Sequence, residues 1–317
     1  MRLPVSEFRR RRDAAGGDEM ASVQGVLGPI EATDLGVTLI HEHLVVDVRQ
    51  RHTGYPDDRA AIVAPMLDDM RRLRDLGVRT LVDCTPTHLG RDLNAYREVA
   101  RATGLQVIAA HGTYRDAWLL DEIRAMSVRA LADWYAAGLD EAGFIKLGCD
   151  PDGPSEAEAR CAEAAGRASD RTGAMVACHL GRAAPAWRIL DAFERGSGDP
   201  ARFVVVHLQN EINSLTQIAL ARRGAWVEFD AIGAAPTDAE YVAMIRNLAD
   251  AGFLDRVLIS QDACAYILGD DGSASRQHRF AYLNETFLPL LRASGFAAGE
   301  VRRLMVENPA RALTGAL

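Results

Sequence analysis

The sequence predicts an α/β protein with the architecture of a (β/α)8 TIM barrel, and three observations support this prediction. Eight short segments of strand character alternate with segments of helical period along most of the chain. The expected strands are nearly continuous apolar runs, as parallel strands are when helices cover the sheet on both faces. The alternation extends over roughly 280 residues, which suits such a barrel because it typically needs about 250.

The expected strands are short, and several are rich in Val and Ile. They lie at residues 37–46, 80–86, 106–114, 143–148, 173–180, 203–209, 225–232 and 257–263. Helical period is clear in residues 61–76 and again in residues 242–254. A doubly wound open sheet is the alternative fold, but no Gly-x-Gly-x-x-Gly motif follows the first expected strand.

The two ends of the chain differ in character. Residues 1–23 are expected to be a polar N-terminal extension, and residues 24–317 a single barrel domain. The run Arg9–Arg12 is not followed by an apolar stretch, so we do not predict an export signal. Residues 268–277 are polar and contain glycine, and we expect a mobile loop there after the last strand.

Composition argues against several classes of partner. The net charge of -8 is unlike the basic face that nucleic acids and anionic membranes require. No run approaches the about 18 apolar residues of a membrane span. The five cysteines are odd in number and show no Cys-x-x-Cys spacing, which favours a reducing compartment over a disulfide framework. We therefore expect a cytoplasmic protein whose partner is a small-molecule substrate.

The most informative segment is Leu39–Leu44, in which His41 and His43 follow an apolar run. Side chains at positions i and i+2 of a strand point to the same face, so the two imidazoles should converge. A transition metal is the commonest reason for two histidines to converge. For this motif alone, a pair of surface or hydrogen-bonded core histidines is an equal alternative.

Further ionisable groups fall toward the carboxyl ends of other expected strands. They are Lys146, His179, His207 and Asp262. In a barrel these ends line one mouth, where active sites lie. Charged groups at buried strand ends are rare unless they are paired or bound to a metal. The set therefore predicts a metal site at the C-terminal face of the strands.

The ligand types suit Zn²⁺, with Co²⁺, Mn²⁺ or Fe²⁺ as alternatives. Four imidazoles and one carboxylate exceed the needs of one catalytic zinc, so we expect two divalent ions with a hydroxide between them. Lys146 has two open interpretations. Burial and nearby cations would favour its neutral amine, which can add carbon dioxide to form a carbamate that bridges two metals. Alternatively, its stem packs in the barrel and its ammonium pairs with Asp262.

The order of these residues resembles that of the phosphotriesterase family in the amidohydrolase superfamily, which includes phosphotriesterase-like lactonases. The segments Gly25–Ile30, Thr38–Leu44 and Glu307–Arg311 also match, so the resemblance spans about residues 24–315. It implies a more buried metal held by His41, His43 and Asp262, a more exposed metal held by His179 and His207, and a carbamylated Lys146 between them. It also implies that Asp262 is the catalytic base, and that the protein is a homodimer.

Two positions depart from the family pattern. Organophosphate-hydrolysing members carry an aspartate where this chain has Asn210, and a histidine (often an arginine in lactonases) where it has Ala231. Neither side chain can supply the missing charge or relay a proton as a carboxylate does. We therefore expect a hydrolase of lactones or carboxylic esters, with organophosphate esters as promiscuous substrates.

Tyr114, Tyr266 and Asn210 are expected to line the substrate pocket, with a packing role as an equal alternative for Tyr266. His111, within the expected strand 106–114, is expected to be satisfied by its neighbours instead of binding metal. Two other functions remain open. One is a mononuclear, deaminase-like amidohydrolase with an unmodified Lys146, which a metal content near one per chain would favour. The other is a barrel that binds a ligand without turning it over.

Overall fold

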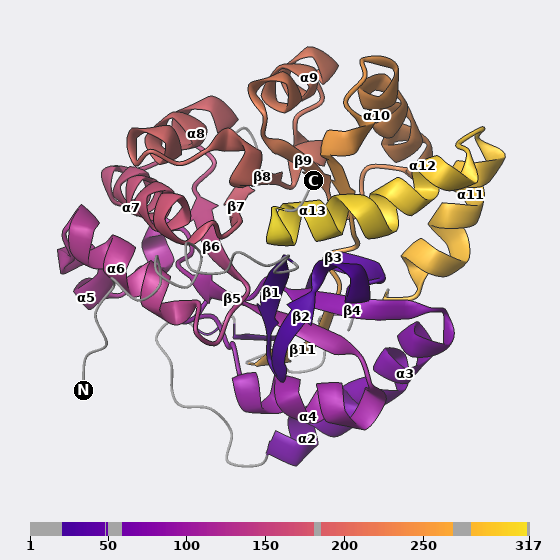
Figure 1. The fold of residues 1–317 in the computed structure, drawn as a ribbon, viewed down its shortest axis with the longest axis horizontal. Helices are drawn as coiled ribbons and strands as arrows, with labels where there is room; N and C mark the ends of the chain where they lie inside the picture. Colours follow the sequence, from indigo (N-terminus) through magenta and orange to yellow (C-terminus); the bar gives the residue numbers. More distant parts are fainter. Residues whose placement is uncertain (1–20, 48, 50–58, 181–184, 269–279, 316–317) are drawn as a thin grey trace, which may run out of the picture.

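The computed structural model describes residues 21–47, 49, 59–180, 185–268 and 280–315. Residues 1–20 of the expected extension and residues 269–277 of the expected loop lie outside the described residues. Strands and helices follow one another around a central axis in sequence order (Figure 1). The predicted α/β barrel is therefore confirmed.

The barrel wall is a parallel sheet with the order β10-β9-β8-β7-β6-β5-β4-β3-β11. Its strands are β3 (Val37–Asp47), β4 (Val78–Asp83), β5 (Gln106–Gly112), β6 (Phe144–Cys149), β7 (Val176–Leu180), β8 (Phe203–Val206), β9 (Trp226–Phe229), β10 (Val257–Ile259) and β11 (Cys264–Leu268). Each of the eight predicted strands overlaps an observed one. Most are shorter than predicted: β7 begins later, at Val176, and the others end sooner.

The eighth strand of the barrel is interrupted. β10 pairs with β9, whereas β11 pairs with β3, so one stretch of chain joins the two ends of the sheet. Between its halves, the backbone N–H of Asp262 donates to the carbonyl of His41 (3.2 Å), and that of His43 donates to the carbonyl of Ala263 (2.8 Å). The predicted strand 257–263 was therefore wrong beyond Ile259, because the chain breaks there before it resumes along β3.

Helices pack around the outside of this wall, except for the last one, which lies across one end of the barrel. They are α2 (Arg59–Val63), α3 (Leu67–Asp75), α4 (Leu93–Thr103), α5 (Asp121–Ala125), α6 (Val128–Gly138), α7 (Glu156–Thr172), α8 (Ala186–Arg195), α9 (Ser214–Arg223), α10 (Asp238–Asp250), α11 (Leu288–Ala293), α12 (Ala298–Arg302) and α13 (Asn308–Thr314). Among the described residues, no helix has the length and apolarity needed to cross a bilayer.

The two helices predicted in detail are present with shifted ends. The first, predicted at 61–76, begins at Arg59 and contains a 3-10 turn at Ala64–Met66. The second, predicted at 242–254, begins at Asp238, because Thr237 and Glu240 form a capping box there. Both corrections concern the ends of helices, where capping side chains decide the boundary.

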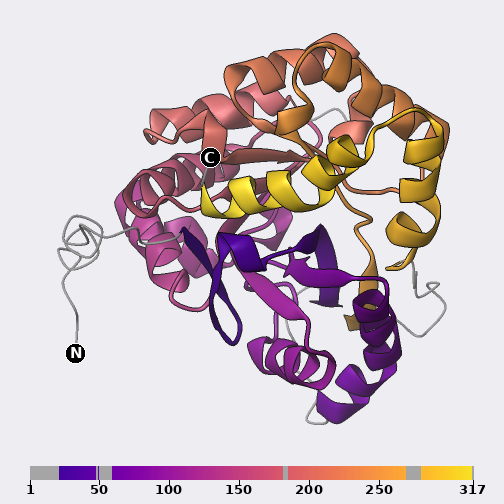
Figure 2. The ribbon, with the colours of Figure 1, turned by 45° about the vertical axis from the view of Figure 1, so that its right-hand side comes forward.

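One end of the barrel is closed by elements outside the sheet. The hairpin of β1 (Ser22–Gly25) and β2 (Gly28–Glu31) and the C-terminal helix α13 lie together across this end (Figures 1 and 2). Their apolar side chains join those that fill the interior; the shared cluster includes Val23, Ile40, Val82, Ile108, Phe144, Val204, Trp226, Leu258, Ala312 and Leu313. A site can therefore open at the opposite end, where the carboxyl ends of the strands lie. The sequence did not predict the hairpin.

His111 lies buried on β5, and we expect it to make stability sensitive to acid. Its ring centroid is 4.1 Å from that of Trp134, and its Nδ1 is 3.0 Å from Thr87 Oγ1. Burial lowers the pKa of His111 to about 4. Because this folded-state pKa lies below the unfolded value of about 6.5, stability is fully present above pH ~6.5 and is lost as the pH falls toward 4.

The loss attributable to His111 is on the order of 3 kcal/mol across this window. Urea denaturation of chelator-treated protein, repeated between pH 7 and pH 4, measures the free energy of unfolding to within about 10–15%. We expect His111→Gln to reduce the slope of the unfolding free energy against pH, whatever its effect at pH 7. An unchanged slope would show that other groups cause the acid sensitivity.

Candidate metal centre

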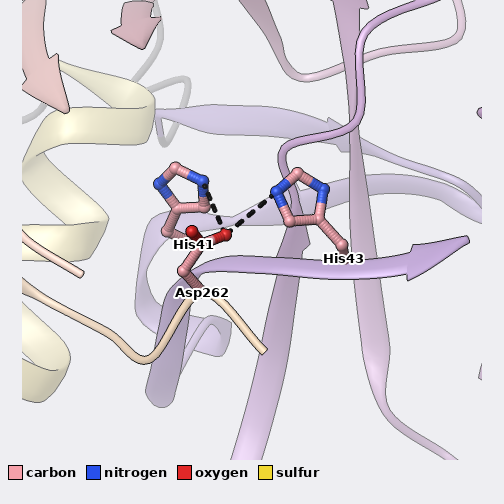
Figure 3. Close-up of side chains that lie close together, drawn as sticks. All are labelled: His41, His43 and Asp262. Atoms are coloured by element: carbon pink, nitrogen blue, oxygen red, sulfur yellow. Dashed lines mark ion pairs between the residues drawn. The ribbon is translucent and has the colours of Figure 1, made fainter. Parts of the chain in front are cut away.

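β3 presents two imidazoles at the open end of the barrel. Because His41 and His43 are two residues apart on one strand, both rings face Asp262 (Figure 3). The Nε2 atoms of His41 and His43 lie 3.6 Å and 3.1 Å from Asp262 Oδ1. The structure thus brings together three of the residues that the sequence predicted as metal ligands, His41, His43 and Asp262.

Glu42, between the two histidines, fixes the segment that carries Asp262. Its carboxylate is buried and accepts hydrogen bonds from Ser260 Oγ (2.9 Å) and from the backbone N–H groups of Gln261 (3.2 Å) and Ala263 (2.7 Å). Burial raises the pKa of Glu42 to about 8 in spite of these bonds. Sequence reasoning gave Glu42 no role; the signal was its place in a buried strand, where an unpaired charge is costly.

His179 and His207 form the second imidazole pair. His179 lies in β7, and His207 follows the end of β8 with a left-handed backbone (φ 60°). The predicted strand 203–209 was therefore wrong beyond Val206. His179 Nδ1 and His207 Nε2 are 2.7 Å apart. Burial and the neighbouring His207 hold the pKa of His179 well below its usual value, so its imidazole is neutral and able to bind a metal.

Two buried carboxylates hold the outer nitrogens of these rings. Glu228 lies on β9, and Asp230 follows the last residue of that strand. Glu228 Oε1 is 2.7 Å from His41 Nδ1, and Asp230 Oδ1 is 2.6 Å from His207 Nδ1. Such carboxylate–histidine pairs fix the ring and its tautomer so that the other nitrogen faces the metal. Thr85 Oγ1 is likewise 2.7 Å from His43 Nδ1.

Asp230 also lies close enough to His41 and His207 to form a candidate metal group with them. Its oxygens are already used, however, because they accept from the backbone N–H of His207 (2.9 Å) and from Gln209 Nε2 (2.8 Å). We therefore interpret Asp230 as a carboxylate that orients the histidines. Sequence reasoning missed Glu228, although two acids at alternating positions of a buried strand were visible.

Lys146 lies at the centre of the site. It is buried on β6, and its Nζ is 3.5 Å from His41 Nε2. Burial lowers the pKa of Lys146, but Cys84, Glu228, Asp230 and Asp262 raise it more, so the net pKa is above the usual value. The expected neutral amine is therefore not favoured by the protein alone; it requires the positive charge of bound cations.

The three predicted pocket residues have different positions. The hydroxyl of Tyr114 is 3.2 Å from His179 Nε2, so this residue belongs to the site. Tyr266 is half-buried in β11, and Asn210 is exposed at the end of a 3-10 turn. Within the described residues, no hydrogen bond or ring contact joins Tyr266 or Asn210 to the imidazoles. Their places in a substrate pocket therefore stay predictions.

The donor set fits divalent transition metals. Each of His41, His43 and His207 has one ring nitrogen held by an oxygen, and the other nitrogen faces a second donor of the site. Neutral imidazole nitrogens together with carboxylate oxygens are typical zinc ligands. The set is consistent with two ions, because the His207 ring, which is paired with His179, has its centroid 5.4 Å from that of His41, and Lys146 Nζ is near His41 as well.

Comparison with known proteins shows the family to which the chain belongs. The pattern that defines the Phosphotriesterase family matches residues 21–313, which is nearly the whole described chain. The chain belongs to the phosphotriesterase family. As a member of this family, it is a metal-dependent hydrolase.

Relatives within the phosphotriesterase family carry different names. The Phosphotriesterase homology protein of Escherichia coli is 30% identical over 87% of this chain and 97% of its own. The N-acetyltaurine hydrolase of Danio rerio is 28% identical over 92% of this chain and 97% of its own. The solved structure of an organophosphorus hydrolase from Deinococcus radiodurans superposes with a TM-score of 0.81, at 28% identity, and covers 94% of this chain and 98% of its own.

Glu228 offers a test of how this phosphotriesterase-family protein orients His41. We expect Glu228→Gln to weaken metal binding by about 10- to 100-fold, the usual cost of losing an outer-shell partner. Metal affinity would be measured by competition with a chromogenic chelator at pH 7. Glu240→Gln is a suitable control, because Glu240 is an exposed glutamate that caps α10. Equal affinities for wild type and Glu228→Gln would show that Asp230 alone orients His41.

Proposed function

We propose that the protein is a binuclear, zinc-dependent hydrolase that cleaves a lactone or another carboxylic ester. The observation that carries this proposal is the meeting of four imidazoles and Asp262 around Lys146, with the outer ring nitrogens held by oxygens. His41, His43 and Asp262 would hold one metal, and His179 and His207 the other. Lys146, carbamylated by addition of carbon dioxide to Nζ with loss of a proton, would bridge them.

Bound divalent ions would supply an acidified water and polarise the carbonyl or phosphoryl oxygen of the substrate. The residues of the chain supply the rest. Asp262 would accept the proton of the attacking water, because its carboxylate lies beside the imidazoles that would hold the metal. Its Oδ1 is 3.1 Å from His43 Nε2 and 3.6 Å from His41 Nε2. Burial raises the pKa of Tyr114, so its phenol stays protonated and can donate a hydrogen bond to the reacting group.

The choice of a carbonyl substrate rests on the residues that could relay a proton away from Asp262. In the described structure Asn210 is exposed, and Ala231 carries no charge. Asp230 is occupied by His207 and Gln209, so it is not free to pass a proton onward. This supports an ester or lactone over an organophosphate, whose hydrolysis remains a secondary activity in the proposal.

A substrate panel tests the proposal. Purified protein loaded with Zn²⁺ or Co²⁺ would be assayed with γ- and δ-lactones, 4-nitrophenyl esters, paraoxon and N-acetyltaurine, alongside elemental analysis. N-acetyltaurine is included because a relative bears the name of its hydrolase. We expect two metals per chain and the highest kcat/KM on a lactone or ester. Two bound metals without turnover of any ester would overturn the proposal, and one metal per chain would favour the mononuclear alternative.

A further inference from the structure

Arg115 places a cation beside the candidate metal centre. It follows Tyr114 directly, and its guanidinium carbon lies 5.4 Å from the centroid of the Tyr114 ring. The hydroxyl of the same tyrosine is 3.2 Å from His179 Nε2. The Tyr114 ring therefore lies between the positive charge of Arg115 and the imidazole of His179.

The backbone around Arg115 is held in place by a buried glutamate on α7. Glu158 Oε1 accepts from the backbone N–H groups of Asp116 (2.9 Å) and Asp150 (3.0 Å), and its Oε2 accepts from the backbone N–H of Ser155 (2.9 Å). The segments that follow β5 and β6 are thus tied to the same side chain. The backbone beside Arg115 is therefore held in place before a ligand binds, which reduces the conformational entropy lost on binding.

The protein does not saturate the Arg115 guanidinium. Among the described residues its ion-pair partner is Asp150, whose Oδ1 is 3.7 Å from Nε, beyond hydrogen-bond length. Nε itself is buried and has no hydrogen-bond partner among the described residues, whereas the side chain as a whole is 32% exposed. A planar guanidinium with free donors matches carboxylate, sulfonate and phosphate oxygens.

We propose that Arg115 binds an anionic oxygen group of the substrate, so that the natural substrate carries a carboxylate, sulfonate or phosphate in addition to its scissile bond. This inference rests on the proposed hydrolase function. The chain has a net charge of -8, which would repel an anionic substrate. The positive charge of Arg115 would offset this repulsion at the open end of the barrel. Arg115 is thus a specificity-determining residue, and Asp150 is the acid that a bound anion displaces.

A matched pair of substrates tests the inference. 4-Nitrophenyl hemisuccinate and 4-nitrophenyl butyrate have acyl chains of similar length, and only the first carries a carboxylate. We expect the zinc-loaded protein to prefer the hemisuccinate, and Arg115→Met to lower the ratio of the two kcat/KM values by about 10- to 100-fold, as for a lost hydrogen bond to a charged group. Arg115→Lys should restore part of that ratio.

Arg171→Met is the control, because Arg171 is 35% exposed and pairs with Asp133 on the outer helices. It should leave the substrate ratio unchanged. Calorimetric binding of succinate to the zinc-loaded wild type and to Arg115→Met gives a second measurement that needs no turnover. An equal ratio and equal succinate affinity in the two proteins would overturn the inference. If no ester or lactone of the substrate panel is hydrolysed, the proposed function fails, but the succinate comparison still decides the role of Arg115.

Discussion

Replacement of Lys146 by methionine should reduce kcat/KM by more than the about 10- to 100-fold that loss of an outer-shell partner costs. Methionine fills a similar volume in the barrel interior, but it cannot carry carbon dioxide or bridge two ions. Metal content should fall from two ions per chain to one or fewer. Elemental analysis of the dialysed protein and steady-state kinetics on the best ester would measure both effects.

Two further measurements separate a bridging role for Lys146 from simple packing. Native mass spectrometry of the wild type should show the added mass of one carbon dioxide, which is lost in Lys146→Met. Lys146→Glu keeps a carboxylate near the same position and should retain two metals and part of the activity. If Lys146→Met kept two metals and full activity, the ammonium of Lys146 would be a packing feature, and the bridging proposal would be wrong.

Replacement of Asp262 by asparagine should lower kcat by about 10²- to 10⁴-fold, the usual contribution of a positioned general base. Burial raises the pKa of Asp262, but the hydrogen bond from His43 and the charges of His41 and His207 lower it further, so the net pKa is below its usual range. The carboxylate is therefore ionised at neutral pH and able to accept a proton. Asparagine nearly matches its shape but has no basic oxygen.

Because Asp262 is also a proposed ligand, its kinetics must be measured at saturating Zn²⁺, with metal content recorded in parallel. Asp255→Asn serves as the control, since Asp255 faces Arg311 outside the site. With both metals bound, the asparagine variant should lose the acidic limb of the pH profile of kcat/KM. An Asp262→Asn protein within tenfold of wild type would assign proton transfer to another group.

The predicted constellation could be recognised from the sequence because parallel strands bring their carboxyl ends to one rim. His41, His179 and Asp262 needed only the right strands in the right order, and a small error in a strand end did not move them away from the mouth. The same tolerance explains why His207 still meets His179, although it lies beyond the strand to which it was assigned.

Residues whose roles depend on neighbouring strands were less predictable. Glu42 and Glu228 act on side chains about 190 to 220 positions away in sequence, so no local pattern links them to their partners. Tyr266 lies on a strand that the sequence did not predict, because the chain resumes along β3 after the break that follows Ile259. The position of Tyr266 followed from an interruption that the apolar pattern does not encode.

The break between β10 and β11 has a consequence for how the protein ages under heat. The residues that close the barrel also carry Asp262, and Glu42 holds their backbone through hydrogen bonds. Local unfolding of this segment would separate Asp262 from the imidazoles while the other strands stay paired. We therefore expect heating to abolish activity before the rest of the fold unfolds.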